Sequence, residues 1–313
     1  MPSNSRKPIS RGNPALFERR ARAVRSANTE ARLSDSDSET SLSPIGSVAK
    51  SNAHFVPRDA RVHVTQDAIE IIGADGDVIH STPLPKAVDT QTPALASTTV
   101  SATIDGWNAY TKWENDSDVD PISHFRTTWD VPADPTNYDS QTLFIFNSLE
   151  PATTGILQPV LQYGPSAAGG GQYWSIASWY LYTDTSDVDH AYYTTLIEVS
   201  SGDPLTGIMN MIDADDTHDY WKCSFDSYSD SSLKIGTAQE LIYATETLET
   251  YNSTGESDLP TGTTNMEDIY LKLKTGGYPT LTWEVYNDAA DSISINVVKD
   301  GSNGGEVDIV YPS

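Results

Sequence analysis

Two glutamines lie four residues apart in a segment that is otherwise mostly apolar, residues 155–164. Side chains alternate along a strand, so Gln158 and Gln162 are expected to point to the same face. An amide among aliphatic side chains costs free energy unless it is hydrogen-bonded or employed in function. Glu240 interrupts a second apolar segment, residues 238–244. If the two segments are neighbouring strands, a hydrogen-bonding amide and a titratable carboxyl converge on one site.

Each of these residues also has a purely structural interpretation. Gln158 and Gln162 could complete backbone hydrogen bonds near Pro159, because proline cannot donate to a strand ladder. Glu240 could be an exposed charge on a half-buried strand. If a contact between a glutamine and Glu240 exists, both structural interpretations weaken together.

Aromatic side chains are concentrated at residues 173–182, where they alternate between the faces of an expected strand. Packing in the core is the usual role of such side chains. The alternative is an aromatic-lined groove that holds a peptide or stacks on sugar rings. In that groove, the candidate substrate-binding residues are Trp174, Trp179, Tyr180 and the upstream Glu150.

The elements that must position these residues are β-strands. From about residue 100 onward the chain is rich in Tyr, Trp, Thr, Val and Ile, and turn signals recur every 8–15 residues. The pattern also fits a helix at residues 238–250 and nowhere else in this part. It predicts an all-β domain over residues 100–313, a two-sheet β-sandwich of the jelly-roll type. Alternating runs indicate that residues 255–313 supply its last strands.

The first hundred residues differ in character from the rest. Residues 1–50 are basic and serine-rich, and a disordered tail is expected there, with a short basic helix from Pro14 to about Ala27. Residues 51–99 are expected to form a small β unit of hairpin or meander type. The unit ends in a Thr/Ala/Pro/Ser-rich linker over residues 86–99.

Charge is distributed unevenly along the chain. Residues 1–50 hold nine basic and five acidic residues, a net charge of +4, whereas residues 101–313 hold seven basic and 33 acidic residues, a net charge of −26. A body that acidic repels nucleic acid and anionic membrane surfaces. The chain also lacks the roughly 18-residue apolar run that a membrane-spanning helix needs. We therefore expect neither nucleic-acid binding nor a membrane span. We also expect the protein to be a monomer.

Cofactor chemistry has little support in the residue pattern. Cys223 is the one cysteine, so no internal disulfide can form. The acidic run at residues 213–219 lacks the Gly and the distal Glu of a calcium hand, and a solvated hairpin loop is expected. Zinc and phosphate-binding motifs are absent. No metal and no cofactor is expected, and no apolar secretory signal follows Met1.

Six segments of the body follow one another in a particular order. They lie at residues 125–132, 143–150, 156–158, 173–180, 197–203 and 238–242. They comprise a threonine-containing strand that ends in Val-Pro, an apolar strand, Ile-Leu-Gln, a Trp/Tyr-rich strand, a Ser-Gly-Asp turn and an Ala-Gln-Glu-Leu-Ile strand. Over about residues 100–255 this order resembles the fungal-type glutamic peptidases, the eqolisin family.

The resemblance implies a lectin-like, concanavalin A-like sandwich and an extracellular, acid-acting endopeptidase with polypeptide substrates. It places Gln158 at the family's catalytic glutamine, with Gln162 as the competing assignment, and Glu240 at the catalytic glutamate. In that chemistry the carboxyl activates a water as general base and then protonates the leaving amine. The amide donates a hydrogen bond to the developing oxyanion.

The sequence also departs from the family pattern. Residues 145–150 lack the family's Trp and Asp, residues 176–179 lack its Glu, and its disulfide cysteines are absent. The alternative function is a non-catalytic, lectin-like module that binds carbohydrate or peptide. Because the family is made with pro-segments, the basic N-terminal helix could cover an acidic cleft at neutral pH and leave it when carboxylates become protonated.

Overall fold

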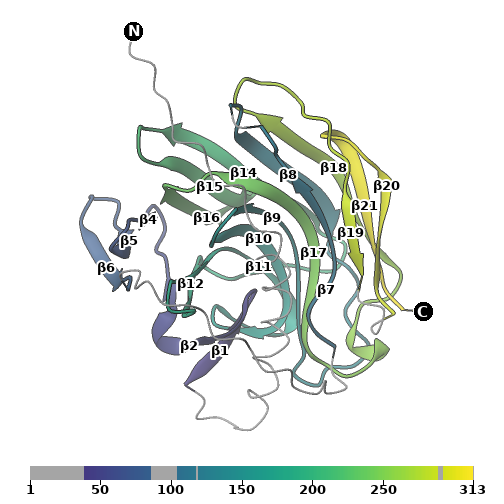
Figure 1. The fold of residues 1–313 in the computed structure, drawn as a ribbon. Helices are drawn as coiled ribbons and strands as arrows, with labels where there is room; N and C mark the ends of the chain where they lie inside the picture. The colour runs from purple at the N-terminus through teal and green to yellow at the C-terminus, as the bar shows by residue number, and fades with distance from the viewer. Residues whose placement is uncertain (1–38, 86–103, 118, 288–291, 313) are drawn as a thin grey trace.

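The computed structural model describes residues 39–85, 104–117, 119–287 and 292–312. These residues form two large, curved β-sheets that lie one over the other as two layers (Figure 1). Two short 3₁₀ helices, η1 (Lys50–Asn52) and η2 (Glu256–Asp258), are the only helical elements among them. The prediction of an all-β, two-sheet sandwich is confirmed. No helix in this part of the chain is long and apolar enough to cross a membrane.

The nine-stranded sheet carries the two glutamines. In spatial order its strands are β19 (Glu284–Asn287), β7 (Ile104–Glu114), β17 (Leu241–Ser253), β9 (Thr142–Pro151), β10 (Ile156–Ser166), β11 (Gly169–Thr183), β12 (Asp189–Tyr193) and β3 (Ala53–Phe55), and β13 (Ile197–Glu198) pairs with β11. Neighbouring strands are antiparallel except β3, which pairs in parallel with β12.

The ten-stranded sheet forms the second layer. In spatial order its strands are β20 (Ser294–Lys299), β21 (Asn303–Val310), β18 (Thr263–Leu273), β8 (Ile122–Asp130), β14 (Pro204–Ala214), β15 (Asp219–Phe225), β16 (Tyr228–Thr237), β4 (Arg61–Val64), β5 (Ala68–Ile72) and β6 (Val78–Pro83). Strands β18, β20 and β21 come from residues 255–313, so this part of the chain extends the sandwich as its alternating pattern indicates.

The main core lies between the two sheets, and strand alternation explains how it is filled. In β15 the buried residues Trp221, Cys223 and Phe225 alternate with Lys222 and Ser224, which are partly exposed. Strands β9 and β10 are instead buried along nearly their whole length, on both faces. Their outer face, turned away from the ten-stranded sheet, lies under a second apolar cluster.

A β-hairpin from the N-terminal region contributes to that second cluster. Strands β1 (Thr40–Ser43) and β2 (Gly46–Ala49) pair with each other, and Leu42, Ile45 and Val48 pack on the outer face of the nine-stranded sheet. The backbone N–H of Ala167 donates to Leu42 O at 2.7 Å. Residues 40–49, which composition places in the tail, are therefore ordered by three apolar side chains that anchor them to the sheet.

The small N-terminal β unit is a meander of β4, β5 and β6. Strand β4 pairs in parallel with β16, so the meander continues the ten-stranded sheet. The expected basic helix at residues 14–27 and the linker at residues 86–99 lie outside the described residues. The helical alternative for residues 238–250 is wrong, because β17 is hydrogen-bonded on both sides, to β7 and to β9.

Candidate functional site

The outer face of the nine-stranded sheet carries a row of polar side chains that crosses the strands. Gln158 pairs with Trp179 on β11. The register of β10 against β9 places Gln158 opposite Ser148, which pairs with Thr245 on β17. Partners that lie directly opposite in antiparallel strands share a face. Lys112 of β7 continues the row opposite Thr245. We call these five residues the amide row: Lys112, Thr245, Ser148, Gln158 and Trp179.

The orientation of the amide row follows from its neighbours. Asn147 and Pro159 adjoin the row and point the other way, toward the ten-stranded sheet. The Asn147 side chain donates to Gly207 O at 3.4 Å, and Pro159 packs against Gly207. Gln158 and Ser148 therefore face outward, away from the core between the sheets.

Gln158 is the least satisfied polar residue of the site. Its side chain is fully buried, and neither Oε1 nor Nε2 has a hydrogen-bond partner. An unpaired buried polar group costs roughly 1–3 kcal/mol. A structural role in completing backbone hydrogen bonds does not account for this amide. It has the full donor and acceptor capacity that a ligand or reacting group would use.

Gln162 has the structural role that Gln158 lacks. Its Nε2 donates to Gly164 O at 2.7 Å and to Gly169 O at 2.9 Å, and its Oε1 accepts from Ser166 Oγ at 2.8 Å. These bonds hold the hairpin between β10 and β11. Of the two glutamines that sequence spacing offers, Gln158 is the one that remains available for chemistry.

The structure does not bring Glu240 into the amide row. Glu240 is half-buried and precedes β17, whereas Thr245 stands in the row of Gln158. Five residues of extended chain separate Glu240 from Thr245, which is roughly 16 Å. The carboxyl that shares the face of Gln158 in the adjoining row is Glu150, the partner of Tyr243. Diagonal neighbours of this kind lie about 7–8 Å apart.

A chain of hydroxyls connects the amide row with Glu150. Ser148 Oγ and Thr245 Oγ1 are 2.6 Å apart, and Thr247 Oγ1 donates to Thr245 Oγ1 at 3.2 Å. Ser148 Oγ donates to Glu150 Oε1 at 3.4 Å. Glu150 is 1% exposed, so these groups form a buried polar cluster on an otherwise apolar face.

Tyr243 is the cross-strand partner of Glu150, and Lys112 lies over the Tyr243 ring. Lys112 Nζ lies 4.3 Å from the centre of the Tyr243 ring. Burial, together with the negative charges of Glu114, Glu150 and Glu284, raises the pKa of Tyr243 to about 12. The phenol therefore keeps its proton at acid and neutral pH. It does not act as a base beside Glu150.

Two further carboxyls of β17 are buried but lie elsewhere. Glu246 points into the core between the sheets and accepts a hydrogen bond from Thr127 Oγ1 at 2.5 Å, and burial raises its pKa well above the ordinary value. Glu249 lies on the outer face, two rows beyond Gln158, and accepts from the Tyr251 hydroxyl. Burial raises the pKa of Glu249 to about 8. Both carboxyls are uncharged in acid.

The aromatic candidates separate by face. Trp174 and Tyr180 lie in the core between the sheets, where each is 1% exposed. Trp179 lies on the outer face beside Gln158, with its ring 5.0 Å from that of Tyr193. Trp179 therefore belongs to the amide row and Glu150 adjoins it, whereas Trp174 and Tyr180 pack behind it.

Other candidate sites found in the sequence have structural explanations. The acidic run at residues 213–219 is the turn between β14 and β15, in which Asp215 accepts hydrogen bonds from the backbone of Thr217 and His218. Within the described ranges, no group of three or more His, Cys, Asp or Glu is placed to hold a metal ion. Burial raises the pKa of Cys223 to about 12, so its thiol is not a nucleophile.

No protein-family model matches the chain, and no curated protein matches it. Among solved structures, Scytalido-glutamic peptidase with a peptide-based transition-state analogue matches with a TM-score of 0.40 and 13% identity. The chain resembles the glutamic peptidases. SCP-B, a member of the eqolisin family in complex with the tripeptide Ala-Ile-His, matches with a TM-score of 0.40 and 15% identity. Each match covers 66% of this chain and 98% of the other chain.

Sequence reasoning missed Ser148, Thr245 and Lys112 as members of the site. The sequence does indicate that Ser148 and Glu150 share one face of a strand, because they stand two positions apart in one segment. The signal that was missing is register. Only the pairing of β9 with β10 and β17 shows that these residues stand beside Gln158.

Proposed function

We propose that the chain is an acid-acting endopeptidase of the glutamic type, with Gln158 as oxyanion donor and Glu150 as general acid and base. The observation that carries this proposal is the buried, unpaired amide of Gln158 beside a buried carboxyl on the same face. Glu240, which the sequence resemblance favours, is the rival carboxyl.

The proposed reaction uses both groups of the pair. The Glu150 carboxylate takes a proton from a water molecule, which attacks the peptide carbonyl carbon. Gln158 Nε2 donates a hydrogen bond to the oxyanion that forms, and does so in a site from which bulk water is excluded. Glu150, now protonated, gives its proton to the leaving amine, which breaks the C–N bond and restores the carboxylate.

Access to the pair requires that a cover be displaced. Gln158 and Ser148 have no exposed area. The β1–β2 hairpin packs on the same outer face, through Leu42 and Val48. We therefore assign a pro-segment role to the N-terminal region, whose withdrawal opens the outer face to a polypeptide.

The test is cleavage of a denatured protein substrate from pH 2 to pH 7. The full chain is compared with a chain cut at a protease site inserted between residues 86 and 99. Acid-peaked cleavage is expected to fall at least about 100-fold in Gln158→Ala and in Glu150→Gln, and to persist in Glu240→Gln.

Two outcomes would count against the proposal in different ways. Loss of cleavage in Glu240→Gln with retention in Glu150→Gln would return the role of general acid and base to Glu240. Absence of cleavage by both the intact and the cut chain at every pH would show that the chain is not a peptidase. Glycan-array binding would then test the lectin-like alternative.

A further inference from the structure

A row of polar and mostly basic side chains crosses the outer face of the ten-stranded sheet, on the side of the sandwich opposite the amide row. Strand register brings its members side by side on five successive strand pairs. From β4 to β18 the row consists of Arg61, Lys234, Lys222, Asn210, His124 and Lys272. Arg126 and Lys274 flank its β18 end. We call these eight residues the basic stripe.

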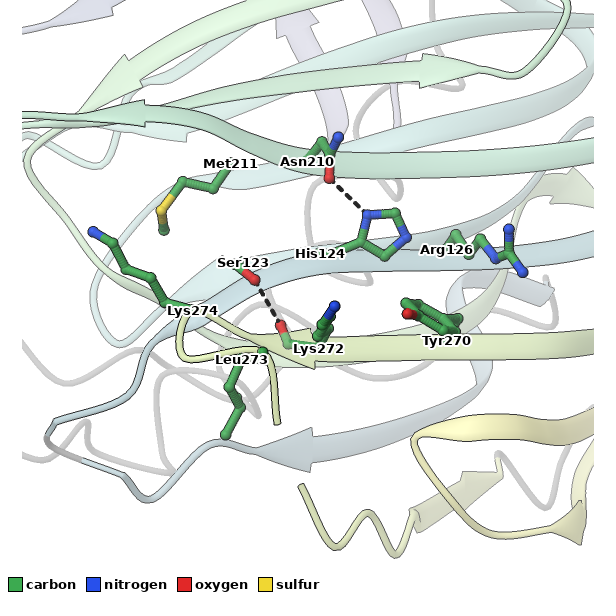
Figure 2. A pocket seen from close by; sticks show the side chains of 10 residues that line it. Ser123, His124, Arg126, Asn210, Met211, Tyr270, Lys272, Leu273 and Lys274 are labelled. Carbon is green, nitrogen blue, oxygen red and sulfur yellow. Dashed lines mark hydrogen bonds between the residues drawn. The ribbon is translucent and has the colours of Figure 1, made fainter. Parts of the chain in front are cut away.

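The β18 end of the stripe is hollowed into a groove of about 550 Å³ (Figure 2). His124 Nδ1 and Asn210 Oδ1 lie 2.6 Å apart across its floor. The Arg126 guanidinium lies 5.1 Å from the centre of the Tyr270 ring. Figure 2 shows the Lys272 and Lys274 side chains on the same groove. Arginine, lysine, amide and phenol groups therefore meet at one place.

The concentration of positive charge in the stripe contrasts with the rest of the body. Residues 101–313 hold seven Lys and Arg residues against 33 Asp and Glu residues, and five of the seven belong to the stripe. Among the described residues, no Lys or Arg of the stripe forms an ion pair with a carboxylate. The stripe cations therefore have no direct carboxylate partner.

Folding alone gives no reason for this arrangement. Like charges directly opposite on neighbouring strands are destabilising, yet Arg61 faces Lys234 and Lys234 faces Lys222. Lysines protect exposed sheet edges from aggregation, but β15, β14 and β8 are interior strands. A row of unneutralised cations that costs stability indicates a ligand that carries negative charge.

The geometry of the stripe narrows the ligand to a linear polyanion. Neighbouring strands lie about 4.8 Å apart, so six strands span roughly 24 Å. The spacing between neighbouring strands is close to the length of one pyranose unit in a polysaccharide chain. Same-side carboxylates of an extended peptide repeat at about 6.6–6.8 Å and would not match it. The phosphates of a duplex nucleic-acid strand repeat at about 3.4 Å along the axis, which does not match the strand spacing either.

We propose that the basic stripe binds an anionic polysaccharide, a chain of carboxylated or sulfated sugars. Its acidic groups contact the Lys and Arg side chains, and one sugar unit occupies the groove. Asn210 and the Tyr270 hydroxyl can hydrogen-bond to neutral sugar hydroxyls there. At physiological salt the screening length is about 8 Å, so such a ligand interacts with the stripe and little with distant carboxylates.

The test measures binding of fluorescently labelled oligogalacturonate and of a labelled heparin oligosaccharide to the full chain by anisotropy. Oligogalacturonate carries carboxylates alone and heparin carries sulfates as well, so the two probes show whether sulfate groups are needed. In Lys222→Gln/Lys272→Gln, Kd for the preferred probe is expected to rise at least about tenfold, and its dependence on salt is expected to weaken. The matched control Lys50→Gln/Lys299→Gln removes the same charge outside the stripe, and Kd is expected to change less than about twofold. Thermal melts establish that both variants fold.

Three results would overturn this inference. One is the absence of saturable binding of either oligosaccharide at 0.05 M NaCl, a salt concentration at which screening is weak. Another is an equal loss of affinity in the stripe variant and the control variant. The third is that poly-glutamate or single-stranded DNA binds as tightly as the sugars, which would assign the stripe to another class of partner. Glu150→Gln is expected to bind the oligosaccharides normally, so the outcome does not depend on peptidase activity.

Discussion

At the scale of single residues, the two glutamines of β10 differ in their hydrogen bonding, and this difference predicts opposite effects of substitution on stability. Both are fully buried on the same face, but Gln162 is bonded at both ends of its amide whereas Gln158 is bonded at neither. Gln158→Leu is therefore expected to stabilise the fold by about 1 kcal/mol, because it removes two unpaired polar atoms. Gln162→Leu is expected to destabilise it by about 1–3 kcal/mol, because it leaves backbone carbonyls unpaired.

Urea denaturation of the two variants at pH 5 measures this difference directly. A stabilised, inactive Gln158→Leu is the behaviour of a residue retained for function at the expense of stability. An equal loss of stability in both variants would instead show that Gln158 has a structural role like that of Gln162.

A second residue-scale prediction concerns Glu249. Burial raises its pKa from 4.5 to about 8, so the folded protein holds this proton more tightly than the unfolded chain does. The stabilisation is complete below pH 4.5 and is lost as pH rises through about 8, at a cost on the order of a few kcal/mol. Glu249→Gln is expected to match the native chain in Tm at pH 4 and to exceed it at pH 9.

Differential scanning calorimetry at the two pH values tests this expectation. The matched control is Glu267→Gln, which neutralises an exposed carboxylate on β18. A gain in Tm at pH 9 that is the same for both variants would mean that overall charge, and not the burial of Glu249, limits stability in alkali.

How far the site could be predicted from sequence is clearest at these residues. Gln158 could be found because an amide in an apolar strand is conspicuous. The choice between Gln158 and Gln162 could not be made, since it depends on where the β10–β11 hairpin turns. The sequence resemblance favours Glu240 as the catalytic carboxyl and Glu150 as a substrate-binding residue. Which carboxyl stands near Gln158 depends on strand register, which sequence order does not reveal.

At the scale of elements, five of the six histidines lie where strands β3–β6 meet the rest of the chain. The rings of His54 and His80 are 4.0 Å apart, and those of His63 and His218 are 4.5 Å apart. Burial, with the nearby His80 and His190, lowers the pKa of His54 to about 4. Burial, with His218 and Arg61, also lowers the pKa of His63, against the opposing charges of Glu70 and Asp215.

These lowered pKa values predict that the N-terminal strands loosen in acid. The unfolded form binds protons below pH 6.5, and the folded form resists them until about pH 4. The stabilisation by neutral His54 is therefore present above pH 6.5 and is lost as pH falls toward 4, by roughly 1–2 kcal/mol once solvent screening is allowed for. Hydrogen exchange at residues 53–83 is expected to accelerate at pH 4.5 relative to pH 7, after correction for intrinsic rates.

The variant His54→Phe/His63→Phe isolates the effect of the charge. His54 Nε2 and His63 Nδ1 are buried without hydrogen-bond partners, so an apolar ring can take each place. In this variant the acceleration of exchange in acid is expected to shrink, while exchange in β14 and β15 stays as in the native chain. Unchanged acceleration would place the cause in carboxylates and not in histidines.

The sequence predicts a strand most clearly where only one of its faces is buried. The alternation in β15 is legible because only one of its faces is buried. Strand β17 also fits a helical interpretation because all but two of its residues are buried, which removes alternation. The β1–β2 hairpin was missed because its three apolar anchors stand among serines, in a segment whose order depends on the sheet beneath it.

At the scale of the whole molecule, charge repulsion within the acidic body sets the response to salt. The net charge is −25 at pH 7, and the pI is about 4.3. Self-repulsion of this size destabilises the compact state, and salt weakens it by shortening the screening length from about 30 Å at 0.01 M to about 3 Å at 1 M. Raising NaCl from 0.01 to 0.5 M at pH 7 is therefore expected to increase Tm by several degrees. At pH 4.3, where the net charge is near zero, the increase is expected to be much smaller.

Thermal melts across this salt range, in NaCl and in choline chloride, test the argument. Screening depends on ionic strength and not on the cation, so the two salts are expected to act alike at pH 7. A different effect of the two salts would indicate binding of a specific cation. An equal rise in Tm at pH 4.3 and pH 7 would indicate a general strengthening of apolar burial instead. Because protonation removes the same repulsion as salt, the acid conditions of the proposed peptidase reaction are also those in which charge repulsion within the body is weakest.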